Sequence, residues 1–218
     1  MEDLLNFLTE LKIHNSRDWF QLNKSWYQKI KTEHEEIVAK VISKIAVFDQ
    51  DVQLLTPRES VFRIYRDVRF SKNRDPYKTA FGAVFCKGGR KSKFAGYYLH
   101  IEPRNTFVGG GIWMPPSDVL KSIRYEIYNF PEEFVKIINQ KEFSDKFGQV
   151  SGDKLTRPPK DFPKDFKYIE LLKHKSFTIG QSFLDDQVKD EIFIEKITLA
   201  FQQMKPFIKF LNRGIENI

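Results

Sequence analysis

The chain has 218 residues, of which 41% are hydrophobic and 30% are charged, and this balance excludes a disordered, collagen-like or membrane-spanning protein. Its one cysteine, Cys86, excludes an intrachain disulfide and a multi-cysteine metal site. No apolar run approaches the roughly 18 residues that cross a bilayer, so we expect no membrane partner. The acidic start, Met1-Glu2-Asp3, is unlike a signal peptide, and we expect a soluble cytoplasmic protein.

The net charge of +7 is concentrated in one part of the chain. Residues 57–104 hold 12 Lys and Arg against 4 Asp and Glu, so this segment carries the whole basic excess. A local excess of this kind attracts anions. The basic residues of 87–93 are typical of a solvated loop, whereas Arg63, Arg66 and Arg69 lie among apolar residues.

The first quarter of the chain has apolar residues three or four positions apart, which is typical of amphipathic helices. Residues 4–11 predict a short helix, and a break follows at 14–16, where Ser16 suits the start of the next helix. The apolar positions from Trp26 onward predict a long helix that ends near Phe48.

After Pro57 the apolar period changes to two, which predicts strands. We expect four strands joined by short connections into an antiparallel meander: 61–65, 80–86, 96–102 and 106–113. In the third of them, Tyr98, His100 and Glu102 share one face because side chains alternate along a strand.

Helices are predicted again after the strands, at 117–128, at 131–140, near 168–174, and from Asp185 to the end, with Pro206 as a kink. The stretch 148–166 contains three prolines and is predicted to be a loop. Helices thus flank one group of strands in the chain. The sequence predicts a single α+β domain over residues 1–218, with a central antiparallel sheet of about four strands between N-terminal and C-terminal helices.

Residues 63–78 form a distinctive run, R-I-Y-R-D-V-R-F-S-K-N-R-D-P-Y-K. It resembles the signature R-x-x-R-D-x-R-F-x-x-[DN]-K-x-x-Y of a bacterial family known as domain of unknown function 2461. Arg74 stands where that pattern has lysine, which keeps the charge but changes the donor geometry. Other stretches similar to the family are Asn15 with Trp19-Phe20, 96–101, 109–113, 157–160 with Phe162, and 171–173. The resemblance implies no particular activity.

Arginine side chains bind carboxylates and phosphates through two parallel hydrogen bonds. We therefore predict that the motif binds a phosphorylated or otherwise anionic small molecule, and that its members lie in one cluster. The candidate ligand-binding residues are Arg63, Arg66, Arg69, Arg74, Tyr77 and Lys78. Aromatic faces for a base or sugar ring are offered nearby by Tyr65, Tyr77, Tyr98 and Trp113.

Other interpretations of the motif stay open. Arg66 and Asp67 could be a buried structural ion pair, in which case Asp67→Asn would clearly lower the melting temperature. The protein could instead be an enzyme, a hydrolase or phosphoryl-transfer enzyme, with Asp67, His100 and Glu102 as candidate catalytic groups. It could also bind nucleic acid through the basic segment, and such binding would be weak and salt-sensitive because the contacts would go to phosphates.

No motif identifies a cofactor. Gly109-Gly110-Gly111 lacks the Lys-Ser/Thr of a phosphate loop and is more typical of a strand that another backbone or a ring approaches closely. The four histidines lack metal-ligand spacing, so no metal site is predicted. We expect Trp19 and Phe20 in the core, His34 at the edge of the core, and an inert Cys86.

Overall fold

An antiparallel sheet of four strands forms the centre of the protein, whose computed structural model describes residues 1–69 and 72–216. The strands follow chain order across the sheet: β1 (Phe81–Phe85), β2 (Gly96–Ile101), β3 (Thr106–Ile112) and β4 (Phe177–Phe183). In the register, Tyr98 pairs with Gly109, and Gly109 pairs with Gly180. These three positions therefore lie side by side across the sheet.

Helices of the described residues come before, between and after the strands. Preceding the sheet are α1 (Glu2–Ile13), α2 (Arg17–Leu22), α3 (Lys24–Ala46), the 3-10 helix η1 (Gln50–Val52) and α4 (Pro57–Ser60). The short η2 (Gly89–Lys91) joins β1 to β2. Between β3 and β4 lie α5 (Ser117–Asn129), α6 (Pro131–Ile138), α7 (Lys141–Phe147) and α8 (Ile169–Leu172), and α9 (Asp185–Lys189) and α10 (Phe193–Glu216) end the chain.

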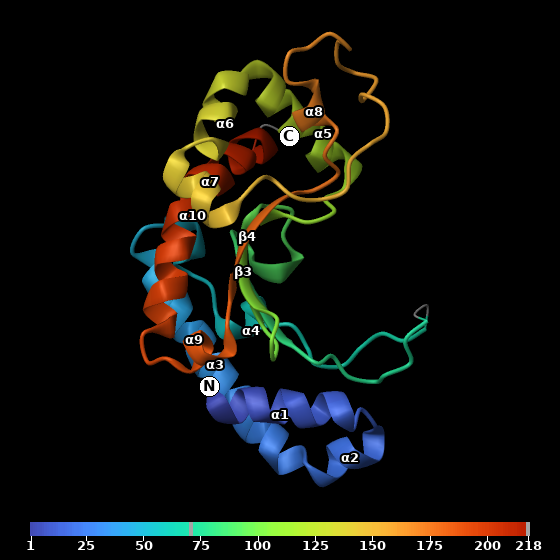
Figure 1. Cartoon of the computed structure of the whole chain (residues 1–218), viewed down its shortest axis with the longest axis vertical. Coiled ribbons are helices and arrows are strands. Elements are labelled where there is room, and N and C mark those ends of the chain that lie inside the picture. Colours follow the sequence, from blue (N-terminus) through green and yellow to red (C-terminus); the bar gives the residue numbers. More distant parts are fainter. Residues whose placement is uncertain (70–71, 217–218) are drawn as a thin grey trace.

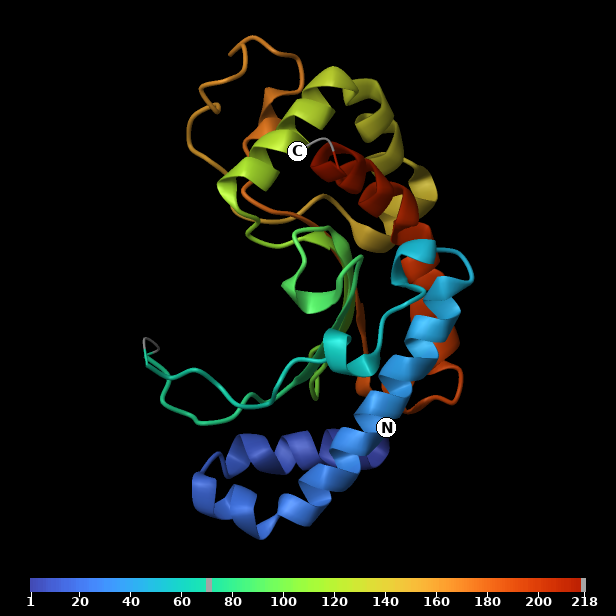
Figure 2. The same cartoon turned by 180° about the vertical axis from the view of Figure 1, so that it is seen from behind.

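The two faces of the sheet have different surroundings (Figures 1 and 2). One face packs on α10 and α3, and its inward side chains, such as Leu99, Val108 and Ile101, are fully buried. Burial of this apolar face against the apolar stripe of α10, which includes Phe201 and Met204, drives the layers together. The opposite face is left open by the long helices in both views. That open face positions the site described below.

The predicted α+β class and four-stranded antiparallel sheet are confirmed, but one strand was assigned wrongly. Residues 61–65 make isolated bridges, Val61 with Ala83 and Tyr65 with Tyr77, and are not a strand of the sheet. The fourth strand is β4, which the sequence did not predict. Alternation shows that a segment is extended but not which neighbour it pairs with, and β4 pairs with β3 across more than 60 residues of chain.

The predicted helices agree with the structure except at their boundaries. Ser16 caps α2, as expected, by accepting a hydrogen bond from the Trp19 backbone N–H at 3.2 Å. The long helix predicted from Trp26 to near Phe48 is confirmed as α3, which runs from Lys24 to Ala46. The predicted C-terminal helix is two helices, α9 and α10, and α10 continues through Pro206. No described helix has both the length and the apolar content that crossing a membrane requires.

Residues 61–69 and 72–80 form an extended double-stranded projection, which we call the arm, and it reaches away from the sheet (Figures 1 and 2). Its two sides are joined by backbone hydrogen bonds: Arg66 N–H donates to the Pro76 carbonyl at 2.9 Å, and Lys78 N–H donates to the Ile64 carbonyl at 2.8 Å. The arm contains the arginine-rich motif, of which Phe70 and Ser71 lie outside the described residues.

The base of the arm is fixed to the N-terminal helices by Asn15. Its side-chain amide donates to the Tyr77 carbonyl at 3.1 Å and accepts from the Tyr77 N–H at 3.1 Å. The Tyr77 ring also stacks on Phe20 with the ring centroids 4.0 Å apart. Both rings of this stack are buried. The N-terminal stretch with Asn15 and Phe20 and the arginine-rich motif, two separate stretches that resemble the same family, are therefore in contact at Tyr77.

Candidate functional site

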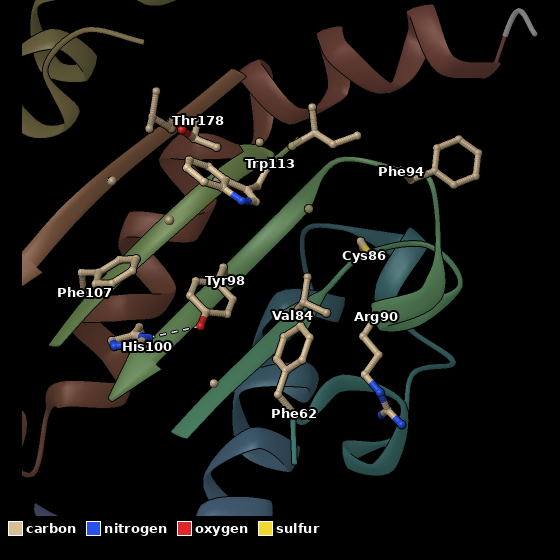
Figure 3. Close-up of a pocket in the computed structure, with 18 of the residues that line it drawn as sticks. Phe62, Val84, Cys86, Arg90, Phe94, Tyr98, His100, Phe107, Trp113 and Thr178 are labelled. Atoms are coloured by element: carbon tan, nitrogen blue, oxygen red, sulfur yellow. Dashed lines mark hydrogen bonds between the residues drawn. The ribbon is translucent and has the colours of Figure 1, made fainter. Parts of the chain in front are cut away.

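A groove of about 830 Å³ lies over the open face of the sheet (Figure 3). We call it the sheet groove. Its floor is formed by side chains and glycines of all four strands, namely Gly82, Val84, Gly96, Tyr98, His100, Phe107, Gly109, Gly111, Thr178 and Gly180. Phe62 and Lys78 of the arm, Arg90 and Phe94 of the β1–β2 connection, and Trp113 also line it.

The three consecutive glycines of β3 have different surroundings. A Cβ at Gly110 would lie 2.8 Å from Met204 Sδ on the covered side, and one at Gly111, where φ is +115°, would lie 2.0 Å from the Phe177 carbonyl oxygen. The fold therefore requires both of these glycines. At Gly109 a Cβ would meet the Ile179 carbonyl oxygen at 3.4 Å, an ordinary contact. Gly109 is open toward the groove although the fold does not require a glycine there.

A line of hydrogen-bonded polar side chains begins in the groove. Tyr98 Oη lies 3.1 Å from His100 Nδ1, and His100 Nε2 lies 3.2 Å from Glu102 Oε2. Burial opposes ionisation of Glu102, but hydrogen bonds from Asn105, His100 and Thr79 outweigh it and lower the pKa of this carboxyl. An ionised Glu102 accepts from His100 Nε2–H, which leaves Nδ1 to accept the Tyr98 proton.

This line orients the Tyr98 hydroxyl and gives it a proton acceptor inside the groove. Burial raises the pKa of Tyr98, and the negative charge of Glu102 raises it further, so the phenol keeps its proton. The face predicted to carry Tyr98, His100 and Glu102 is therefore confirmed, and its members are in contact. The arrangement is suited to proton transfer or to hydrogen bonding with a ligand.

Positive charge gathers at the arm side of the groove. Burial lowers the pKa of Lys78, and the nearby charges of Arg63 and Arg66 lower it further. None of these three cations takes part in an ion pair between described residues. Arg90, at another part of the rim, donates a hydrogen bond to the Arg58 carbonyl. Among the described residues that line the groove there is no Asp or Glu.

The structure distributes the predicted ligand-binding residues along the arm. Lys78 lines the sheet groove, and Arg63 lines a smaller cavity beside it. Arg69 and Arg74 line neither of these two cavities, and Arg74 donates to the Val68 carbonyl at 3.2 Å. Tyr77 is buried, with its ring against Phe20.

The interpretation of Arg66 and Asp67 as a buried ion pair is wrong. Asp67 pairs with Arg69 through Nε–Oδ1 and Nη2–Oδ2 distances of 2.9 and 2.6 Å, and the two side chains are 44% and 76% exposed. On an extended backbone residues 67 and 69 share a face, whereas residue 66 points to the opposite side. The bidentate hydrogen bonds from the Arg69 side chain, with one from its backbone, lower the pKa of Asp67 to about 2.

We expect Asp67→Asn to leave the melting temperature close to that of the wild type at pH 7, because exposed ion pairs stabilise proteins very little. Folding lowers the pKa of the Asp67 carboxyl, so any small stabilisation of the folded state by the Asp67–Arg69 pair is present at pH values above the ordinary pKa of an aspartate. This stabilisation disappears as the pH falls toward 2, where Asp67 takes up its proton. Thermal melts against Asp75→Asn, the same change at another exposed residue of the arm, provide the control. A clearly larger loss for Asp67→Asn would contradict this expectation.

Some groove residues gave no usable signal in the sequence. Arg90 belongs to a stretch interpreted as a solvated loop, and the positive φ angles of Gly88 and Gly89 in the turn before it bring it to the rim. Phe62 was placed on a sheet strand but lies on the arm.

Two expectations about single residues agree with the structure. Phe20 is buried as expected. Burial raises the pKa of Cys86 to about 11, in line with an inert thiol.

The fold and the groove define a class: an α+β protein in which helices cover one face of a four-stranded antiparallel sheet and the other face forms an open, glycine-floored groove. The family model described as conserved hypothetical protein (DUF2461) matches residues 3–210, and the chain belongs to this family. No curated protein and no solved structure matches the chain. Within the described residues, no group of three or more His, Cys, Asp or Glu side chains could hold a metal ion.

Proposed function

We propose that the protein binds a small ligand with a flat apolar body and an anionic group, and that the sheet groove is its binding site. The observation that carries this proposal is the composition of the groove: a floor opened by glycines, aromatic side chains around it, cations on its rim and no carboxylate among its described lining residues. Its volume of about 830 Å³ lies within the usual range for small-molecule sites, roughly 300–1,000 Å³.

The apolar body of the ligand would lie over Gly109, where no side chain fills the floor. Tyr98, Phe107 and Trp113 line the groove and offer aromatic surface for stacking (Figure 3). Trp113 is 68% exposed, so a large apolar side chain that the fold leaves in water would gain burial from a ligand.

The anionic group would lie toward Lys78. Arg63 and Arg66 are close enough to Lys78 to lower its pKa, and an anion would relieve the repulsion among these cations. Arg69 and Arg74 lie further along the arm and would contribute through their long-range field, which attracts an anion at low salt. In this proposal only the part of the motif near Lys78 contacts the ligand, whereas the sequence predicted one binding cluster formed by the whole motif.

Two fluorescent probes with the same body test the proposal. 1-Anilinonaphthalene-8-sulfonate carries a sulfonate that N-phenyl-1-naphthylamine lacks. We expect the sulfonate probe to bind at least about tenfold more tightly, because a charge-assisted hydrogen bond contributes roughly 1.5–3 kcal/mol. This preference should decrease in Lys78→Gln and at high salt.

Lys72→Gln is the matched control, since Lys72 is an exposed lysine of the same arm that lines neither cavity. It should keep the preference for the sulfonate probe. Equal affinity of the wild type for the two probes, or an equal effect of the two lysine substitutions, would refute the assignment of the anionic end.

A second candidate function, catalysis on such a ligand, is favoured by the line from Tyr98 through His100 to Glu102. A hydrolase or phosphoryl-transfer enzyme needs a positioned acid or base, and this line supplies one inside the groove. Asp67 does not fit that role, because it is held by Arg69 outside the groove. Turnover of an aryl phosphate that disappears in His100→Asn while probe binding persists would distinguish an enzyme from a binding protein.

A further inference from the structure

A second cavity, of about 420 Å³, shares Phe62 and Arg90 with the sheet groove. It is bounded by α3, α4 and the base of the arm, and we call it the α3 cavity. Its polar lining includes Tyr27, His34, Arg58, Arg63 and Tyr65. Of these residues, only Arg63 has a role in the proposed function of the sheet groove. The α3 cavity is therefore a candidate for a second binding site.

The α3 cavity is strongly cationic. Arg58, Arg63 and Arg90 line it, and none of them forms an ion pair with a described carboxylate. Lys31 and Glu35 also line it, but Lys31 Nζ lies 3.5 Å from Glu35 Oε1, so the charges of these two side chains largely neutralise each other. Guanidinium groups are suited to an oxyanion because a guanidinium can donate two parallel hydrogen bonds to it. Of these three arginines, only Arg90 donates a side-chain hydrogen bond to another described residue, from one N–H to the Arg58 carbonyl.

A buried ring nitrogen of His34, a residue that lines the same cavity, has no partner in the described part of the chain. His34 is 2% exposed, and its Nε2 makes no hydrogen bond with any described residue. Its ring stacks on Phe81 with the centroids 4.8 Å apart, which fixes its orientation. Buried polar atoms are usually paired, so the unpaired nitrogen of a residue that lines a cationic cavity points to an external partner. Burial lowers the pKa of His34 to about 4, so at neutral pH the ring is uncharged and can present one N–H donor.

We propose that the α3 cavity binds a phosphate group, with Arg58, Arg63 and Arg90 holding its oxygens and His34 donating from the buried side. The hydroxyls of Tyr27 and Tyr65 make no hydrogen bond to other described residues and offer further donors. The cavity exceeds the size of one phosphate ion, so it has room for inorganic phosphate or the phosphate of a small ester. Because Arg90 borders both cavities, an anion here lowers the positive potential of the sheet groove.

The test is calorimetric titration of the whole protein with inorganic phosphate and with phenyl phosphate at low ionic strength. We expect binding of at least one of them, with Arg63→Gln and His34→Phe each weakening it about tenfold or more. His34→Phe keeps the ring stack on Phe81 and removes the unpaired nitrogen, so its melting temperature should not fall. Stronger binding of phenyl phosphate identifies an ester as the ligand, and equal or weaker binding identifies free phosphate.

Two controls keep this proposal separate from that for the sheet groove. Lys72→Gln should leave phosphate binding unchanged, and Gly109→Leu should leave it unchanged while it blocks the fluorescent sulfonate probe. Absence of phosphate binding by the wild type would overturn the proposal. Unchanged affinity in Arg63→Gln, a substitution at an exposed position, would also overturn it.

Discussion

Replacing Gly109 by leucine is expected to abolish ligand binding in the sheet groove while the protein stays folded. A Cβ at this position meets ordinary contacts, and the rest of a leucine side chain would fill the floor between Tyr98 and Gly180. We expect the affinity for 1-anilinonaphthalene-8-sulfonate to fall at least about a hundredfold, since the probe and the side chain need the same space. The melting temperature should hold or rise, because glycine within a strand is less stable than alanine by roughly 0.5–1 kcal/mol.

Gly111→Ala provides the contrast within the same strand. Its Cβ would lie 2.0 Å from the Phe177 carbonyl oxygen, and its φ of +115° disfavours any side chain. This smaller substitution should therefore destabilise the protein far more than Gly109→Leu. Fluorescence titration and thermal melts of the two variants measure both effects. If Gly109→Leu binds the probe as the wild type does, the groove is not the binding site.

Asn15→Ala is expected to give a large loss of stability for a substitution outside the sheet. Asn15 forms two hydrogen bonds with the backbone of Tyr77, which lies 62 residues away along the chain. Alanine leaves the N–H and carbonyl of Tyr77 without these partners, and we expect about 2–4 kcal/mol of destabilisation. For a chain of this size that corresponds to a fall in melting temperature of roughly 5–15 °C.

The same substitution should loosen the base of the arm, because Tyr77 precedes Lys78 and its ring position depends on this anchor. Limited proteolysis within residues 61–80 should become faster, and binding of the sulfonate probe should weaken. Asn23→Ala is the matched control, since the Asn23 side chain makes one local hydrogen bond, to the Trp19 carbonyl at 2.9 Å. Equal losses of stability in the two asparagine variants would show that Asn15 does not anchor the arm.

The position of Asn15 also explains why two separate stretches of the sequence resemble one family. Asn15 lies between α1 and α2, Phe20 belongs to α2, and Tyr77 ends the arginine-rich motif, yet Tyr77 contacts both of the other residues. Part of the motif is therefore structural: Tyr77 fastens the arm, whereas Lys78 next to it faces the groove. Adjacent residues on an extended chain point to opposite sides, which lets one short run serve both purposes.

The sequence by itself determined the features that depend on local periodicity. Apolar residues recurring every three or four positions predicted the long helix α3, and alternation placed Tyr98 and His100 of β2 on one face with Glu102, the residue that follows β2. Both succeed because the backbone of a single element decides which side chains share a face. The same argument, applied to residues 66, 67 and 69, accounts for the pairing of Asp67 with Arg69 and not with Arg66.

Only the tertiary structure decided which extended segments became neighbours. Apolar and polar residues alternate in 61–65 as they do in a strand, but this segment pairs with the later part of the arm, where Tyr65 bridges Tyr77. The strand that completes the sheet is β4, which lies far along the chain from its partner β3. The groove follows from these pairings, because Gly109 lies open only when β2 and β4 flank it and no helix packs on that face. The sequence shows only that a glycine has no side chain. Its neighbours in the tertiary structure decide whether that space is occupied by other parts of the protein, as at Gly110 and Gly111, or is open to a ligand, as at Gly109.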